Sequence, residues 1–511
     1  MRVGKLFTIP ALAAVGVSCA DSPETLPNIL LIVADDLGMG DVSSYGAKAI
    51  NTPNIDNLAD NGIRFENGYA TSATSTPSRY GMFTGLYPWR NADAKILPGD
   101  APLIISTDTP TLPKLLQKTG YNTAAIGKWH LGMGDGNTDW NKEIHPSANT
   151  VGFDYTCLIA ATNDRVPTVY VENGLVEGLE ADDPIYVSYK ENFEGESTAL
   201  THPELLKMKW HHGHNNSIVN GIPRIGFMKG GEKAKWVDED MADYFVAKVK
   251  KYIDSQRQDR PFFLYYGLHQ PHVPRAPHSR FVGSTGLGPR GDAVVEADWC
   301  VGEVIAYLDN KGMLENTLVI FTSDNGPVIN DGYYDDAEEC LGDHDPRGGT
   351  RGGKYSLYDG GTHVPLITYW KGKIRPQISS SLVSQLDFFA SIARLVGAEM
   401  PEDTDSQDHL KAFMGEDKAG RRDIVHEAQG KLSYRNGQYA LIPPYNGAKR
   451  NITRNELGNL PDWHLFDLAK DRGERTDISN DKPEILESLK RKFLLIAGDM
   501  YKPKKADTPL E

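Results

Sequence analysis

Two pairs of oxygen-bearing side chains each follow a strongly apolar segment of the 511-residue chain. Asp35 and Asp36 form the first pair, and Asp324 and Asn325 form the second. Oxygen ligands suit Ca²⁺ or Mg²⁺, whereas zinc usually takes imidazole and thiolate ligands. Either pair alone could as readily cap a helix or face solvent. Because both pairs stand at the ends of predicted buried strands, the sequence favours a divalent cation site.

A second chemical signal is the segment Ser75–Arg79, which reads S-T-P-S-R and is followed by Thr84-Gly85. A short Ser/Thr/Pro-rich segment is by itself typical of a turn. This one resembles the signature of the type I sulfatases, which implies that Ser75 is oxidised after synthesis to formylglycine (3-oxoalanine). The hydrated aldehyde carries two hydroxyls on one carbon, so one can attack sulfur and the other can then expel sulfate by reforming the carbonyl.

The resemblance also implies one Ca²⁺ as cofactor. Its ligands would be the formylglycine derived from Ser75 together with Asp35, Asp36, Asp324 and Asn325. The ion would orient the attacking hydroxyl and, as a Lewis acid, take up charge on a sulfate oxygen.

Three more segments resemble sulfatase sequence blocks and carry cationic and titratable side chains. Lys128 and His130, in G-K-W-H-L-G, would lie beside the formylglycine hydrate, where His130 takes its proton as sulfate leaves. His272, in H-Q-P-H-V-P, would be the general acid. Lys354, in R-G-G-K, would contact both the sulfate and the leaving oxygen. With Arg79 of the signature, these lysines would make the pocket positive and stabilise a dianion-like transition state.

The overall charge is consistent with a small cationic pocket in an acidic protein. The chain has 54 Lys and Arg residues against 69 Asp and Glu residues, a formal net charge of -15. This balance argues against a nucleic-acid partner, which usually meets a basic surface. An acidic protein that handles an anionic ester must therefore concentrate its positive charge locally.

Other segments resemble the N-acetylgalactosamine/galactose-6-sulfatase group, namely 161–167, 274–283 and 288–292. The resemblance implies an exo-acting carbohydrate sulfatase for 6-O-sulfated galactose or N-acetylgalactosamine, with a sulfated glycan as its partner. We expect Asp164 and Arg165 to hydrogen-bond the axial O4 of the sugar, although a surface ion pair is the alternative. Further candidates for the substrate rim are His211, His212, His344 and Arg347.

Three alternatives remain open. Within the sulfatases, the substrate could be a 4-O- or 3-O-sulfated galactose or N-acetylgalactosamine, or an aryl sulfate. Outside them, a phosphoesterase of the alkaline phosphatase superfamily would use Ser75 unmodified and hold two zinc ions, which the oxygen-rich ligand set fits less well. A third alternative is a surface glycan-binding lipoprotein without turnover.

The pattern of apolar residues predicts an α/β fold. Continuous apolar runs, typical of strands buried on both faces, occur at Asn28–Ala34, Thr123–Ile126, Pro261–Gly267 and Thr317–Thr322. Amphipathic helical patterns occupy 241–256 and 292–309. Alternation of such elements predicts a mostly parallel sheet sandwiched by helices, with ligands at the carboxyl ends of the strands. The family resemblance implies an alkaline-phosphatase-like large domain.

The chain is expected to divide into a sulfatase catalytic domain at 26–397 and a smaller C-terminal subdomain at 398–511. The C-terminal pattern changes to short strands separated by turn residues, followed by an amphipathic helix at Pro483–Leu495. The expected antiparallel strands are Asp423–Ala428, Leu432–Arg435, Gln438–Ile442 and Trp463–Leu468.

Residues 1–19 are expected to be an export signal. A basic start is followed by the apolar run Leu6–Val17, which is too short to span a bilayer. Cys19 resembles the lipidated cysteine of a bacterial lipoprotein, and cleavage near Ala20 is the alternative. The expected location is the periplasm or the outer membrane of a bacterium, with membrane contact only through that lipid. A serine rather than a cysteine at Ser75 implies an anaerobic sulfatase-maturating enzyme as a partner.

Overall fold

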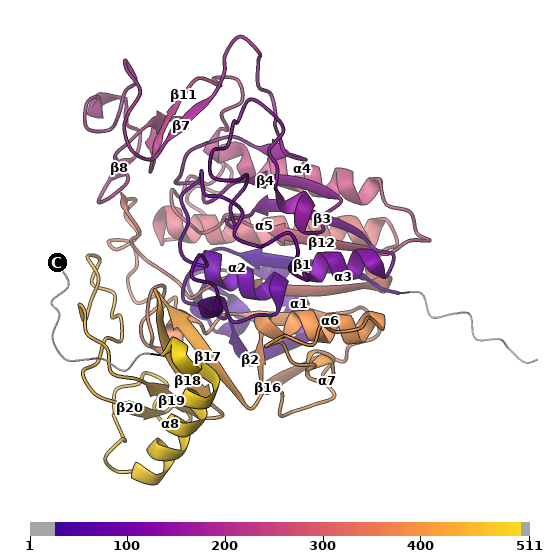
Figure 1. Cartoon of the computed structure of the whole chain (residues 1–511), viewed down its shortest axis with the longest axis vertical. Helices are drawn as coiled ribbons and strands as arrows, with labels where there is room; N and C mark the ends of the chain where they lie inside the picture. Colours follow the sequence, from indigo (N-terminus) through magenta and orange to yellow (C-terminus); the bar gives the residue numbers. More distant parts are fainter. Residues whose placement is uncertain (1–25, 502–511) are drawn as a thin grey trace, which may run out of the picture.

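The central feature is a large mixed sheet (Figure 1). A computed structural model describes residues 26–501, so the expected signal at 1–19 and the lipidation at Cys19 lie outside the described residues. In spatial order the ten strands are β16 (Gln377–Ser384), β2 (Ile63–Tyr69), β15 (Leu366–Tyr369), β13 (Thr317–Ser323), β1 (Asn28–Ala34), β12 (Phe262–Gly267), β3 (Asn122–Lys128), β4 (Tyr155–Ile159), β5 (Val171–Glu172) and β6 (Leu175–Val176).

The predicted parallel arrangement holds for the centre of this sheet. Strands β13, β1, β12, β3 and β4 follow one another in the sheet and are all parallel to one another. Strand β15 is antiparallel to both β13 and β2, and β5 and β6 are antiparallel additions at the other edge. The carboxyl ends of the five central strands therefore meet at one edge of the sheet.

Both faces of the sheet are buried, which explains why the central strands are continuous apolar runs. In β1, Ile29, Leu31 and Val33 contribute to one apolar core, whereas Leu30 and Ile32 contribute to another. Helices α2 (Ser75–Thr84), α3 (Leu112–Lys118) and α6 (Phe388–Val396) cover the first face. Helices α1 (Pro53–Asn61), α4 (Met241–Asp254) and α5 (Gly288–Asn310) cover the second.

The segment between β6 and α4 forms small two-stranded sheets rather than part of the large sheet. Their strands are β7 (Tyr186–Ser188), β8 (Lys209–Trp210), β9 (Ile218–Val219), β10 (Ile222–Pro223), β11 (Phe227–Lys229) and, from a later part of the chain, β14 (Tyr333–Tyr334). Figure 1 shows β7, β8 and β11 beyond one end of the large sheet. No helix within residues 26–501 has the length and apolar character needed to cross a bilayer.

A four-stranded antiparallel sheet follows α6 and the short helix α7 (Leu410–Phe413). Its strands are β17 (Asp423–Ala428), β18 (Lys431–Asn436), β19 (Tyr439–Ile442) and β20 (His464–Asp467), covered by helix α8 (Pro483–Ala497). Strand β17 also contacts the segment just before α2: the Ala73 N–H donates to the Glu427 carbonyl, and the Glu427 N–H donates to the Thr71 carbonyl. The C-terminal sheet therefore helps to position the start of α2.

Candidate active site

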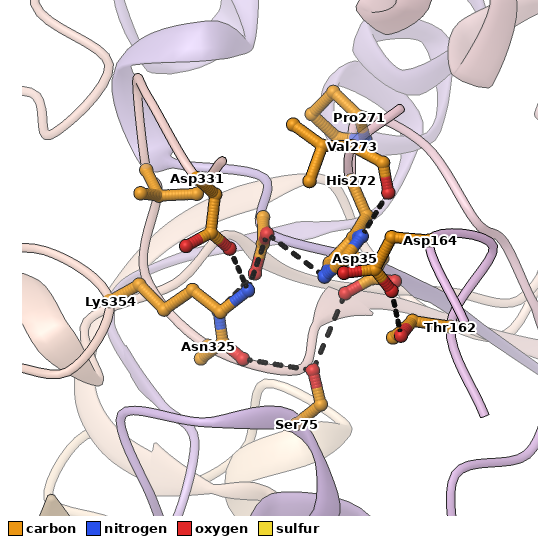
Figure 2. A network of polar contacts seen from close by, with 12 residues as sticks. Asp35, Ser75, Thr162, Asp164, Pro271, His272, Val273, Asn325, Asp331 and Lys354 are labelled. Atoms are coloured by element: carbon orange, nitrogen blue, oxygen red, sulfur yellow. Dashed lines mark hydrogen bonds and ion pairs between the residues drawn. The ribbon is translucent and has the colours of Figure 1, made fainter. Parts of the chain in front are cut away.

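Most of the chemically predicted residues meet at the carboxyl edge of the central sheet, where ligand sites of α/β folds are found (Figure 2). Each follows or ends a central strand or begins a helix. Asp35 and Asp36 follow β1, Asp324 and Asn325 follow β13, Lys128 ends β3, His272 lies beyond β12, and Ser75 begins α2. The parallel pairing of β1 with β13 and β12 brings these strand ends side by side.

Ser75 is the first residue of α2, so the Ser/Thr/Pro-rich segment opens a helix instead of forming an isolated turn. Pro77 is accommodated because backbone N–H groups in a first helical turn have no partner within the helix. The Ser75 hydroxyl oxygen is 2.8 Å from Lys128 Nζ, 3.5 Å from Asp35 Oδ1 and 3.4 Å from Asn325 Oδ1. The helix N-terminus adds a positive end beside an incoming anion.

Three fully buried carboxylates, each paired with a cation, form the floor of the site. The pairs are Asp35 Oδ1 with Lys128 Nζ at 2.6 Å, Asp324 Oδ2 with Arg79 Nη2 at 2.8 Å, and Asp36 Oδ2 with Lys354 Nζ at 2.8 Å. Burial raises the pKa of Asp35 well above its ordinary value, and the neighbouring carboxylates add to this effect. At Asp324 burial is outweighed by Lys128 and Arg79, which lower the pKa of its carboxyl.

The residues present fit a divalent cation. Asp35 Oδ2 is buried and has no hydrogen-bond partner among the described residues. Ligand atoms of Asp35, Asp36 and His272 lie within 4.8 Å of one another. An unpartnered carboxylate oxygen in such a place is costly unless a cation binds it. The surrounding carboxylate and amide oxygens are the donors that Ca²⁺ prefers.

Two buried histidines present one ring nitrogen each to the site. His130 Nε2 is 3.0 Å from the Leu97 carbonyl, so its Nδ1, which has no partner among the described residues, is the free nitrogen. His272 Nδ1 is 2.6 Å from the Val273 carbonyl, which leaves Nε2 facing Asp36 Oδ2 at 3.8 Å. Burial, and then the charge of Lys354, lower the pKa of His272 to about 4. Burial and then Lys128 lower the pKa of His130 well below its ordinary value. Both rings are therefore neutral near pH 7.

A cavity of about 200 Å³ opens above this floor. Its lining includes Ser75, His130, His272 and Lys354 together with the predicted rim residues Asp164, Arg165 and His212. Asp164 is buried, and its carboxylate is 2.8 Å from both Arg165 Nη1 and His214 Nε2. Burial opposes the charge of Asp164, but Arg165 and His214 hold the pKa of its carboxyl well below the usual range. Asp164 and Arg165 are thus a buried pair that lines the cavity, not a surface ion pair.

Three predicted rim residues are not brought to this cavity. His344 turns to Asp41, where its Nε2 is 2.9 Å from Oδ1, and Asp41 also pairs with Arg290. The Arg347 guanidinium pairs with Asp345 at 2.7 Å. His211 packs against His212 and Tyr334 outside the lining. In each case a contact with another side chain holds the residue outside this cavity.

The structure adds three polar cavity residues that were not predicted from the sequence: His214, Asp331 and Tyr355. Asp331 Oδ2 is 2.8 Å from Lys354 Nζ, and Asp331 Oδ1 accepts a hydrogen bond of 2.8 Å from the Tyr355 hydroxyl. Lys354 therefore lies between Asp36 and Asp331. The H-H-G-H sequence could have pointed to His214, whereas Asp331 lies in a loop that carries no distinguishing signal.

Comparisons with known proteins agree with this geometry. The sulfatase family model matches residues 27–398. The chain is 49% identical to an N-acetylgalactosamine-6-O-sulfatase of Bacteroides thetaiotaomicron over 91% of each chain, and 31% identical to human arylsulfatase A over 92% of this chain and 88% of the relative. A solved structure from work on the metabolism of multiple glycosaminoglycans by B. thetaiotaomicron superposes with a TM-score of 0.91 at 47% identity, covering 92% of this chain and 99% of the other. The alkaline-phosphatase-like fold is shared with these neighbours.

We predict that Asp331→Asn moves the alkaline limb of the pH–rate profile for sulfate-ester hydrolysis to lower pH. Burial alone would lower the pKa of Lys354, but Asp331 and Asp36 outweigh it and hold the pKa well above its ordinary value. Loss of one carboxylate therefore lets the ammonium lose its proton at lower pH. We also expect kcat/KM at neutral pH to fall about 10-fold, the order expected for a lost hydrogen bond to a charged group.

Tyr355→Phe is the matched control, because it removes the other partner of Asp331 and keeps its charge. This variant should move the alkaline limb less than Asp331→Asn does, because Tyr355 raises the pKa of Lys354 less than Asp331 does. An unchanged limb in Asp331→Asn would mean that Asp331 does not control the protonation of Lys354.

Proposed function

The chain belongs to the sulfatase family and is a sulfuric ester hydrolase, and from this premise we propose that it removes a 6-O-sulfate from a terminal galactose or N-acetylgalactosamine of a glycan. The observation that carries the proposal is a cavity lined by Ser75, Lys354 and the Asp164–Arg165 pair. Below it, Lys128 contacts the Ser75 oxygen and Arg79 pairs with the buried Asp324. The similarity to a bacterial N-acetylgalactosamine-6-O-sulfatase supports the sugar and the position.

We propose that Ser75 is converted to formylglycine, as is general in the family, and supplies the nucleophilic hydroxyl. Ca²⁺, when bound by Asp35, Asp36, Asp324, Asn325 and residue 75, would supply Lewis-acid stabilisation of sulfate oxygen charge. Lys128 Nζ, which contacts the Ser75 oxygen, favours ionisation of a hydroxyl at that position. The Arg79 contact with Asp324 keeps that carboxylate ionised and ready to bind a cation.

The two histidines divide the proton transfers in this proposal. His130 Nδ1 has no hydrogen-bond partner within residues 26–501, and the ring is neutral, so this nitrogen can accept a proton from a hydroxyl at residue 75. His272 presents an unprotonated Nε2 in the free enzyme and must gain a proton before it acts as general acid. An anionic ester beside it would favour that gain, because a nearby negative charge raises the pKa of an imidazole. Lys354 would contact the sulfate and the leaving oxygen.

The rim of the cavity supports recognition of a galacto-configured sugar. The Asp164 carboxylate can accept a hydrogen bond from the axial O4 hydroxyl, and the Arg165 guanidinium can donate one to the same oxygen. His214, which contacts the far oxygen of the Asp164 carboxylate, fixes its orientation. His212 would complete the rim, whereas His211, His344 and Arg347 have no part in this proposal.

We also propose that the protein is exported to the periplasm or anchored at the outer membrane through Cys19, and that an anaerobic sulfatase-maturating enzyme acts on Ser75. The apolar N-terminal run and the serine at the signature position support these steps. The proposed division at residues 397 and 398 places the large sheet in the catalytic domain and the four-stranded sheet in the C-terminal subdomain.

The nucleophile is tested by mass spectrometry of the tryptic peptide 65–79, from protein matured in an anaerobic host. We expect a mass lower by two hydrogens at Ser75, and sulfate release in proportion to the converted fraction. Ser75→Ala should show neither. Sulfate release from protein in which every Ser75 is unmodified would contradict the proposal.

The sugar assignment is tested with Asp164→Ala. We expect kcat/KM on a 6-sulfated galactoside to fall about 10- to 100-fold, the range for loss of a charged hydrogen bond of about 1.5–3 kcal/mol. Hydrolysis of a small aryl sulfate should change much less, and the wild type should prefer the 6-sulfated over the 4-sulfated sugar. Asp259→Ala, in the exposed Arg257–Asp259 pair, is the control and should leave both rates unchanged. Equal losses on sugar and aryl substrates in Asp164→Ala would contradict recognition of O4.

A further inference from the structure

A second cavity of about 500 Å³ lies beside the catalytic one. Ile96 lines both cavities, and Thr74 and Pro77, on either side of Ser75, line the second. We propose that this second cavity binds the next sugar of an oligosaccharide whose terminal sulfated sugar occupies the catalytic cavity, and that this next sugar carries a carboxylate or a sulfate. The inference rests on the proposed function and extends it from a single sugar to an acidic glycan chain.

Size is the first argument for a separate binding site. The catalytic cavity, at about 200 Å³, is below the roughly 300–1,000 Å³ that clefts for drug-sized ligands usually enclose, so it has little room beyond one sugar. The second cavity lies within that range. The two cavities share Ile96, so they adjoin each other.

The second cavity is built by both parts of the molecule. Segment 89–96 forms one wall, and the turn between β17 and β18, with Leu432 and Met500, forms the other. Trp89 is buried and stacks on Tyr87 with ring centroids 5.0 Å apart, which makes its wall rigid. A rigid aromatic and aliphatic wall with a few polar groups is typical of a preformed ligand site.

The charges of the second cavity favour an anionic occupant. Lys95 is exposed on its lining and forms no ion pair within the part of the chain that the structure describes. Within residues 26–501, Glu427 is the one acidic residue in the lining, and it is buried. Its carboxylate accepts hydrogen bonds from the Ser72 hydroxyl, at 2.5 Å, and from the Gly430 N–H. Among the residues that the structure describes, Lys95 is therefore the one lining cation available to a ligand, and the lining acid already has protein partners.

The direction of the glycan chain agrees with this placement. Asp164 and Arg165 line the catalytic cavity and not the second one. In a pyranose ring C4 and C1 lie at opposite ends, so a sugar that offers O4 to this pair directs its C1 linkage away from it. The second cavity is lined by Ile96 and by Thr74 and Pro77, the neighbours of Ser75, and not by that pair, so it is the adjoining space to which we assign such a linkage.

The test compares kcat/KM for a 6-sulfated N-acetylgalactosamine monosaccharide with that for disaccharides that continue from its C1. The second sugar is a uronic acid, a sulfated hexosamine or a neutral hexose. We expect Lys95→Ala to lower kcat/KM about 5- to 20-fold on an acidic disaccharide. The acidic disaccharide whose kcat/KM falls more, the one with the uronic acid or the one with the sulfated hexosamine, shows whether the site binds a carboxylate or a sulfate. The neutral disaccharide and the monosaccharide should change less than about twofold. Ala92→Trp, which fills the cavity from an exposed position, should lower kcat/KM on all disaccharides.

Matched controls are Lys48→Ala and Ala49→Trp, two exposed positions that line a different cavity and should change no rate. Calorimetric binding of the acidic disaccharide to a Ser75→Ala background, with and without Lys95→Ala, gives a readout that does not require turnover. The proposed function would be contradicted if the wild-type protein hydrolysed no 6-sulfated sugar. The second site alone would be overturned if Lys95→Ala and Ala92→Trp proteins bound and hydrolysed disaccharides as the wild type does. Equal losses on monosaccharide and disaccharides would overturn it as well.

Discussion

Three carboxylates removed from water in one place are the constraint on which the rest of the site depends. Burying a single ion costs several kcal/mol even after the protein relaxes, and like charges at close range add to that cost. Arg79, Lys128 and Lys354 offset it, since each pairs with one of the three aspartates. The compensation is incomplete, because one oxygen of Asp35 has no protein partner within residues 26–501. The site is therefore arranged around a further positive charge.

The sheet explains how these charges can be held so close together. Strands β1, β13, β12 and β3 are parallel neighbours, and their rigid carboxyl ends supply the carboxylates and Lys128 directly. Ser75 comes from outside the sheet, and α2 presents it with the helix N-terminus toward the same point. Backbone hydrogen bonds between β17 and the segment at Thr71–Ala73 hold the start of this helix. The C-terminal sheet therefore helps to hold the segment that leads into Ser75.

Much of this arrangement could be predicted from the sequence, and the failures have physical causes. Strand β1 was predicted with its observed bounds because burial on both faces leaves a continuous apolar run, whereas β2 mixes buried and exposed positions and was missed. Side chains that directly follow a central strand, or that begin α2, lie together at the carboxyl edge of the sheet, as the sequence predicts. The positions of loop side chains could not be predicted from the local sequence. His344 is held by Asp41, and Asp331 contacts Lys354 from a loop. Asp41 and His344 are 303 positions apart in the chain, and the loop position of Asp331 has no periodic pattern that would reveal its contact.

The most direct measurement of the central claim is the metal content of the purified chain, together with its thermal stability in the presence and absence of a chelator. The account predicts one Ca²⁺ per chain, a lower Tm after chelation, and recovery of Tm with Ca²⁺ but not with Zn²⁺. At a Ca²⁺ concentration 100-fold above the dissociation constant, the stabilisation should be about 2.7 kcal/mol. Two equivalents of zinc, or a Tm that does not respond to removal and return of Ca²⁺, would contradict it.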